Sequence, residues 1–192
     1  MPRAGLDTDM VIATAARMTN EFGIEQITLK MIAAELDVQT PSLYNHIKSF
    51  DELKRKLMIY GWKQMEEQLV QAVIGVSGEE AAKAMCKEFY AFATGNSGLF
   101  DVMLWYNKFQ DEETMAVTER LFDCMMKVFA SMGISEQMGA HFIRTFRSFL
   151  EGYCLLLNRG AFGNAISTQE SFEMSVNALI AGIRAVQGNE TK

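Results

Sequence analysis

The chain has 192 residues, 49% of them apolar, and a formal net charge of −6 from 18 basic and 24 acidic side chains. This length corresponds to one large domain or two small ones with an ample core, and the apolar content excludes a disordered protein. The negative total does not by itself exclude a nucleic-acid partner, because net charge describes the average surface rather than one patch.

Several classes of site are disfavoured by the spacing of the reactive residues. Cys86, Cys124 and Cys154 form no CxxC pair, so we expect small buried thiols and no metal site. The sequence motifs of phosphate-binding loops, zinc proteases and serine hydrolases do not occur, so we expect no enzyme and no cofactor. The N-terminal MPRAGLDTD is not typical of a signal peptide, and no run of 18 apolar residues occurs; we expect a cytoplasmic protein without a membrane partner.

Helical periodicity recurs along the chain, and prolines stand only at positions 2 and 41. Apolar residues repeat at intervals of three and four, which indicates amphipathic helices and an all-α fold. In chain order, we predict helices at about 8–22, 29–36, 41–46, 50–75, 79–94, 99–106, 111–132, 136–158 and 168–186. Capping side chains precede the first four helices: Asp7 or Thr8, Thr28, Thr40 and Ser49. Gly23 is predicted to end the first helix.

Residues 28–47 hold the most informative pattern. Two short helices joined by Asp37-Val38-Gln39 are typical of a helix-turn-helix. A helix that reads the major groove needs polar or flat side chains and no acidic ones. Residues 38–50 contain no Asp or Glu and offer these donors and acceptors: Gln39, Thr40, Ser42, Tyr44, Asn45, His46 and Lys48. The alternative is an ordinary polar helical hairpin.

The segment ITLKMIAAELDVQTPSLYNHIKSFDELKRKL resembles the DNA-binding domain of the TetR (tetracycline-repressor) family. The matching positions are Thr28, Ile32-Ala33, Asp37-Val38 and Leu43-Tyr44-Asn45-His46-Ile47. The resemblance covers about residues 8–60. It implies an N-terminal three-helix helix-turn-helix domain (1–50), a linking helix (51–75) and a C-terminal helical domain for ligand binding and dimerisation (76–192).

The resemblance also implies roles for the matching residues. Thr28 would cap the second helix and contact a phosphate, and Pro41 would contact a thymine methyl group. Tyr44, His46 and Lys48 would contact phosphates. The complete set of expected DNA-binding residues is Thr28, Lys30, Gln39, Thr40, Pro41, Ser42, Tyr44, Asn45, His46 and Lys48.

The start of the fourth helix departs from the family pattern. Family members commonly have a lysine where this chain has Phe50, which is followed by Asp51 and Glu52. The run Lys54-Arg55-Lys56 either supplies the missing phosphate contact or is only a solvated helix face.

Residues 61–192 carry −5 of the net charge of −6, from 11 basic and 16 acidic residues. The last predicted helix has an apolar face and a second face of small residues, which predicts burial on two sides and a homodimer. The expected interface residues are Phe149, Tyr153, Ala178, Ala181, Gly182 and Ala185. A core helix of a monomer is the alternative. The segment Phe146–Gly163 resembles the WHG-type TetR subgroup, with Glu151 in place of its usual histidine.

Phenylalanine and methionine are abundant in the larger half, and methionine-rich cores adapt to varied shapes. This composition favours a pocket for a hydrophobic effector, with plain core packing as the alternative. The expected pocket residues are Phe89, Phe92, Met103, Trp105, Phe122, Met125, Met126, Phe129, Phe146 and Phe149. Arg144, Arg147 and Glu151 would contact polar ligand atoms or form interface salt bridges.

These patterns together predict a homodimeric, ligand-responsive transcriptional regulator, most simply a repressor, that binds palindromic operator DNA. One rival is a helical small-molecule-binding protein with a non-functional helix-turn-helix. An enzyme that uses the apolar pocket is a second rival, although no nucleophile, base or metal spacing supports it.

Overall fold

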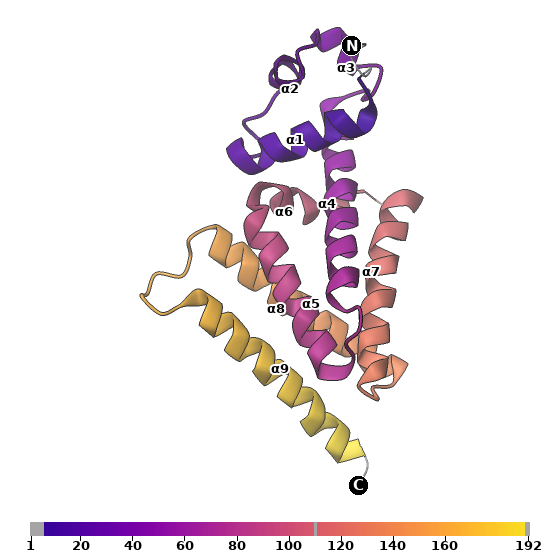
Figure 1. Cartoon of the computed structure of the whole chain (residues 1–192), viewed down its shortest axis with the longest axis vertical. Helices are drawn as coiled ribbons and strands as arrows, with labels where there is room; N and C mark the ends of the chain where they lie inside the picture. Colours follow the sequence, from indigo (N-terminus) through magenta and orange to yellow (C-terminus); the bar gives the residue numbers. More distant parts are fainter. Residues whose placement is uncertain (1–5, 110, 191–192) are drawn as a thin grey trace. The chain divides into compact units, whose positions relative to one another are not determined.

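A computed structural model describes residues 6–109 and 111–190, and every regular element within these residues is a helix (Figure 1). The predicted all-α fold is therefore confirmed. The elements are α1 (Thr8–Phe22), α2 (Leu29–Glu35), α3 (Thr40–Leu43), α4 (Phe50–Ala72), α5 (Gly78–Gly95), α6 (Ser97–Met103), the 3₁₀ helix η1 (Tyr106–Lys108), α7 (Glu112–Ser131), α8 (Glu136–Asn158) and α9 (Thr168–Glu190). None of the helices in the described part is long and apolar enough to cross a membrane. Residues 1–5, part of the stretch considered above as a signal peptide, lie outside the described residues.

Local capping chemistry determines where the first helices begin. The Asp7 side chain accepts a hydrogen bond of 2.7 Å from the Met10 N–H, which caps α1. Thr28 and Ser49 make the equivalent bonds at α2 and α4, at 3.2 and 3.1 Å. Gly23, with φ of 81°, ends α1. These four signals were predicted and are confirmed.

The third helix differs from the prediction. Its N-cap is Gln39, whose side chain makes no capping bond, and Thr40 is already helical. The helix ends at Leu43 rather than near His46, because the next three N–H groups donate to carbonyls three residues back. The third helical segment is therefore one short helical turn, α3, followed by a tighter turn over residues 44–46.

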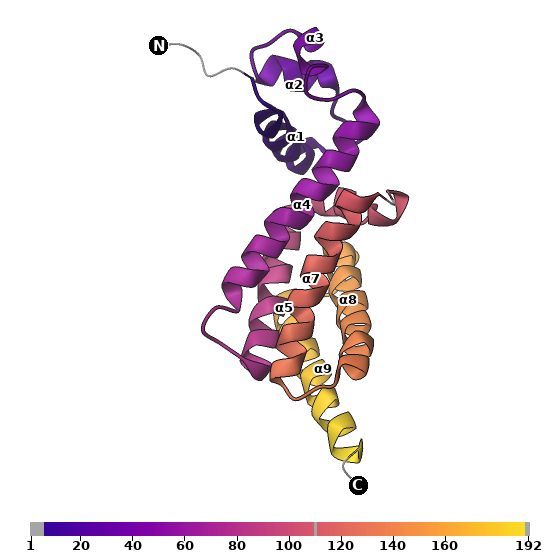
Figure 2. The same cartoon turned by 90° about the vertical axis from the view of Figure 1, so that its right-hand side faces the viewer.

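The first of two compact units comprises residues up to 64 together with 96–117. Its core contains side chains that are 0% exposed from α1, α2, the α3 region and α4: Val11, Ala15, Ile32, Leu43, Ile47, Leu53 and Leu57. Helices α1 to α3 gather around the first turns of α4, as both views show (Figures 1 and 2). Helix α6 belongs to the same unit, and the Trp62 indole N–H donates to the Met103 carbonyl at 3.1 Å.

The second unit comprises residues 65–95 and 118 onward. Helix α5 packs against α8 and α9, and α8 packs against α9. Phe129 of α7 contacts Phe142 and Phe146 of α8, with ring centroids 6.1 and 5.5 Å apart. Because α4 and α7 contribute residues to both units, this grouping does not decide the predicted domain boundaries at 50 and 75, which stay predictions.

Candidate nucleic-acid interface

A left-handed residue and one backbone hydrogen bond form the turn between α2 and α3. Asp37 has φ of 54°, the left-handed region that Asp tolerates better than most residues. The Val38 N–H then donates to the Ala33 carbonyl at 2.9 Å, which ends α2 and reverses the chain. The two short helices therefore meet as a helix-turn-helix.

The expected DNA-binding residues lie mainly at the surface of this motif. Leu43 and Ile47 point into the core and are 0% exposed, so the neighbouring polar side chains face outward. Tyr44 is 55% exposed, which is unusual for a large aromatic ring with core positions on either side. The exposed side chains among the expected residues are Thr28, Lys30, Gln39, Pro41, Tyr44, Asn45 and Lys48, whereas Thr40, Ser42 and His46 are half-buried.

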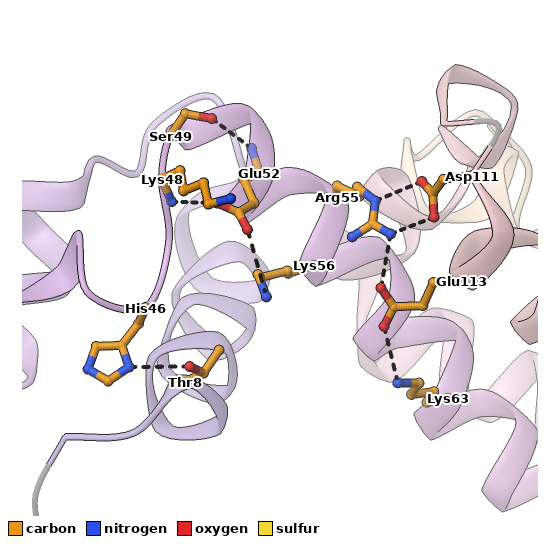
Figure 3. A network of polar contacts seen from close by, with 10 residues as sticks. All are labelled: Thr8, His46, Lys48, Ser49, Glu52, Arg55, Lys56, Lys63, Asp111 and Glu113. Atoms are coloured by element: carbon orange, nitrogen blue, oxygen red, sulfur yellow. Dashed lines mark hydrogen bonds and ion pairs between the residues drawn. The ribbon is translucent and has the colours of Figure 1, made fainter.

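Two of the expected phosphate contacts already have partners within the protein. The Thr28 hydroxyl oxygen accepts from the Met31 N–H, which leaves the hydroxyl proton for an outside acceptor. His46 Nδ1 lies 3.2 Å from the Thr8 hydroxyl at the start of α1 (Figure 3). Its Nε2 atom is the ring nitrogen that could reach a phosphate.

The acidic residues at the start of α4 have a structural role. The Glu52 carboxylate accepts from the Lys48 backbone N–H and lies 3.9 Å from the Lys56 ammonium (Figure 3). Glu52 therefore anchors the loop that follows the α3 region. The Lys48 ammonium makes no ion pair within residues 6–109 and 111–190, so it is available to a phosphate.

The Lys54-Arg55-Lys56 run is neither free nor simply solvated. Arg55 donates twice to Asp111, at 2.7 and 2.5 Å, and once to Glu113, at 2.9 Å (Figure 3). This contact raises the pKa of Arg55 and holds the pKa of Asp111 well below its usual range. A phosphate contact from Arg55 would have to break these bonds.

The other two basic residues of the run also have internal contacts. The Lys54 ammonium lies over the rings of Phe50 and Trp105, at 5.1 and 5.4 Å from their centroids. Lys56 pairs with Glu52 as described above. The contribution of the run to DNA binding stays a prediction, and sequence reasoning gave no signal for the Arg55–Asp111 pair.

The expected pocket residues are divided between the two units. Met103 and Trp105 lie in the first unit and the other eight in the second. The buried members are Phe89, Phe92, Met103, Phe129 and Phe146. Phe122 is 41% exposed, so it faces away from the core of its own unit. Their role as a ligand pocket stays a prediction.

One open groove in the second unit is lined by residues that sequence reasoning did not single out. Its volume is about 520 Å³, and it lies between the last turns of α4, the α4–α5 connection and α7. Val70, Ile74 and Val76 form an exposed apolar part of its lining. Two of its charged residues form an ion pair, since Arg120 lies 3.3 Å from Glu66. The other two, Lys127 and Asp123, carry opposite charges, so the net charge of the lining is zero.

The expected dimer residues fall into two groups. The small residues of α9 are exposed: Ala178, Ala181, Gly182 and Ala185. Phe149 and Tyr153 are half-buried and contact each other within the unit, with ring centroids 5.5 Å apart and ring planes tilted by 50°. The Tyr153 hydroxyl donates to the Thr168 carbonyl, so these two rings also support the start of α9.

The charged residues expected near the pocket or the interface partly pair with each other. Arg147 Nε donates to the Glu151 carboxylate at 2.6 Å, one turn along α8, while Arg144 is exposed. In the described part of the chain, His, Cys, Asp and Glu side chains form no group of three that could hold a metal ion.

Comparison with known proteins decides the family. The family model for the tetracyclin repressor-like C-terminal domain matches residues 82–179, half of the chain. The chain belongs to the TetR family of transcriptional regulators. It is 27% identical to the uncharacterized HTH-type transcriptional regulator YobS of Bacillus subtilis (strain 168), over 95% of each chain.

Solved structures show the same fold at low identity. A protein of unknown function from Rhodococcus sp. RHA1 superposes with a TM-score of 0.82 at 14% identity, covering 94% of this chain and 97% of that one. A TetR variant from Acinetobacter baumannii AYE, solved in complex with minocycline, has a TM-score of 0.73 at 18% identity, covering 95% and 98%. The predicted family and fold are thus confirmed.

Proposed function

We propose that this TetR-family regulator is a homodimeric repressor whose α2–α3 motif binds a palindromic operator. The observation that carries the proposal is the surface of residues 39–48, where polar side chains and Tyr44 stand outside a core sealed by Leu43 and Ile47. Such side chains match the donors, acceptors and methyl groups of the major groove. A protein with this partner acts where the DNA is, in the cytoplasm.

The charge distribution supports recognition by base contacts. Residues 38–50 contain no acid, while the chain as a whole carries −6. Because the surface is not broadly basic, we expect weak non-specific binding and a small number of phosphate contacts per subunit. Operator affinity then depends on base contacts and on two half-sites that the dimer binds together.

The exposed small residues of α9 support the dimer. An added Cβ at Gly182 would meet nothing within 4 Å, so this face has room for a second helix to approach closely. A two-fold axis beside α9 would pair it with the same helix of a second copy. The two recognition elements would then contact half-sites about one DNA turn apart.

The proposed effector is a hydrophobic small molecule that releases the operator. Two observations support it: the buried aromatic residues of the second unit and the minocycline complex of the Acinetobacter baumannii neighbour. Effector binding would change the tilt of α4 and the spacing of the recognition elements. A coupling free energy of about 1–3 kcal/mol between the two sites is typical of such systems.

A selection experiment tests the proposal and does not require the operator sequence to be known. The full chain is incubated with a library of random DNA duplexes, and bound duplexes are amplified and sequenced over several rounds. We expect enrichment of one palindromic motif whose half-sites lie about 10 base pairs apart. Failure to enrich any motif would overturn the proposal.

The helical small-molecule-binding protein is the second candidate function. It is favoured by the internal contacts of Lys54, Arg55 and Lys56, which remove basic side chains from the surface near the motif. It predicts ligand binding with no enriched DNA motif, so the same selection separates the two candidates.

A further inference from the structure

A groove between α5 and α9 combines an aromatic floor with a positively charged edge. Its volume is about 350 Å³, within the range of small-molecule sites. Cys86, Phe172 and Val176 form a buried floor, and half-buried Tyr90 completes it. All of the lining residues belong to the second unit, so the groove is defined within one compact body.

The floor is held in place by neighbouring rings. Tyr90 and Phe172 lie 4.5 Å apart between centroids, with their planes tilted by 39°. Phe172 also stacks on Phe149 at 5.6 Å and meets Tyr153 edge-on at 5.4 Å. Because these rings brace one another, the floor offers a rigid surface for a planar aromatic ligand. Burial raises the pKa of the Cys86 thiol to about 12, so this part of the floor is uncharged at neutral pH.

The α5 edge of the groove carries two cations. Lys83 and Lys87 are exposed, lie one turn apart, and make no ion pair with any residue that the structure describes. Glu79, four residues before Lys83, would be its natural helical partner, but Glu79 pairs with Arg184 of α9 instead. Like charges at this spacing repel each other, and an anion placed between them relieves the repulsion.

The α9 edge is chemically different. It presents Gln169, Glu173 and Asn177, which follow each other one turn apart. The Gln169 amide donates to one oxygen of the Glu173 carboxylate at 3.2 Å, and the carboxylate retains further acceptor capacity. The two lysines and one glutamate give the rim a net charge of +1, whereas the whole chain has a net charge of −6.

We infer that this groove binds a planar aromatic carboxylic acid with a hydroxyl group at its far end. The ring lies on the Tyr90–Phe172 floor, the carboxylate lies between Lys83 and Lys87, and the hydroxyl donates to Glu173. None of the expected DNA-binding or pocket residues lines the groove, so the inference does not rest on the proposed function.

The end of the groove at Gln169 lies away from the proposed dimer interface. Gln169 at its edge and Ala178 on the small-residue face are nine residues apart, which is two and a half helical turns. They therefore lie on opposite sides of α9. A partner helix on the Ala178 side would leave the Gln169 end of the groove accessible, whereas Asn177 lies one turn before Ala181 and borders the proposed interface.

Calorimetric titration of the full chain with 6-hydroxy-2-naphthoate tests the inference. The uncharged analogue 6-hydroxy-2-naphthamide controls for the carboxylate, and 2-naphthoate controls for the hydroxyl group. We expect the hydroxynaphthoate to bind most tightly and its binding to weaken as salt is raised. No binding at millimolar concentration, or equal binding of the naphthamide, would overturn the inference.

Two sets of variants place the binding at the groove. Lys83→Met together with Lys87→Met keeps the apolar stems and removes both charges, and should weaken hydroxynaphthoate binding by about three- to tenfold. Lys127→Met changes an exposed lysine of α7 outside this groove, and it should leave the affinity for hydroxynaphthoate unchanged. Equal affinity of the double variant and the unaltered chain would contradict the assignment.

Discussion

The Asp111 carboxylate accepts hydrogen bonds from two residues, Arg55 and Thr114. It accepts two hydrogen bonds from Arg55, and two more, at 3.1 Å, from the N–H and hydroxyl groups of Thr114. These donors favour the ionised form and hold the pKa of Asp111 well below its usual range. The stabilisation is complete above the unfolded-state pKa near 4 and is lost as the pH falls toward the lower folded-state pKa.

Replacing this carboxylate should therefore have a pH-dependent effect on stability. Asp111→Asn should lower the free energy of unfolding at pH 7 by about 1 kcal/mol, because the pair is partly exposed to solvent. The difference from the unaltered chain should shrink as the pH falls below about 4, because the Asp111 carboxylate then takes up a proton in the unfolded chain while it stays ionised in the folded chain. Urea denaturation at several pH values measures both effects. Asp123→Asn, at an exposed carboxylate of α7, is the control, and a difference independent of pH would contradict the account.

The three cysteines should differ in reactivity. Burial raises the pKa of both the Cys86 and Cys154 thiols to about 12, and these two are buried, whereas Cys124 is half-exposed. Since the thiolate is the reactive form, Cys124 should react with iodoacetamide first in the folded chain. Mass spectrometry of partly labelled protein checks this order. Labelling of Cys86 before Cys124 would show that the described packing of α5 is wrong.

Sequence reasoning was strongest for residues whose role is local. The capping roles of Asp7, Thr28 and Ser49 follow from side-chain chemistry within a few residues, and the structure shows each of them. The Arg55–Asp111 pair joins residues 56 positions apart, and no periodicity or motif connects them. Pairs of this kind depend on tertiary packing, which one sequence does not specify.

Among the helices, α2 and α8 were predicted to within one residue at each end, whereas α3 and α6 were not. The predicted helix at 136–158 has the same bounds as α8, and the structure shows that Ser135 caps its start. The third helix was predicted to run to about residue 46, but α3 ends at Leu43. The spacing of apolar residues does not distinguish a helix from the tighter turn that follows Leu43. Helix α6 ends at Met103, and the chain continues in the 3₁₀ helix η1.

Helices α1 and α6 approach each other so closely that only glycine fits at their crossing. A Cβ added at Gly98 would lie 2.0 Å from the Thr19 carbonyl oxygen, a backbone atom that cannot move aside easily. Gly98→Ala should therefore lower the free energy of unfolding by about 1–3 kcal/mol. Gly95→Ala is the matched control, because a Cβ there would meet nothing within 4 Å. Thermal unfolding followed by circular dichroism compares them, and equal melting temperatures would contradict this packing.

For the molecule as a whole, the exposed face of α9 determines the proposed assembly. Ala178→Asp places a charge where the symmetry-related helix would pack, and burial of that charge is costly. We expect this variant to be monomeric at concentrations where the unaltered chain is a dimer. Gln169→Asp, on the opposite side of α9, should remain dimeric. Sedimentation velocity measures both, and a dimeric Ala178→Asp variant would place the interface elsewhere.

The functional sites of the whole molecule could be predicted only in part from the sequence. The helix-turn-helix could be recognised because its turn, caps and lack of acidic residues lie within some twenty positions. The grooves of the second unit could not, because residues such as Val70, Lys127 and Phe172 come together only in the folded chain. The acidity of residues 61–192 is compatible with DNA binding, since the expected contacts lie at residues 28–48.

The central claim is that the α3 region and the loop after it read the operator. It is tested most directly by fluorescence anisotropy with the palindromic duplex obtained by selection. Tyr44→Ala together with Lys48→Ala should weaken binding by about tenfold or more and reduce the salt dependence, whereas Lys127→Ala should bind like the unaltered chain. Unchanged operator affinity in the Tyr44→Ala, Lys48→Ala variant would contradict the account.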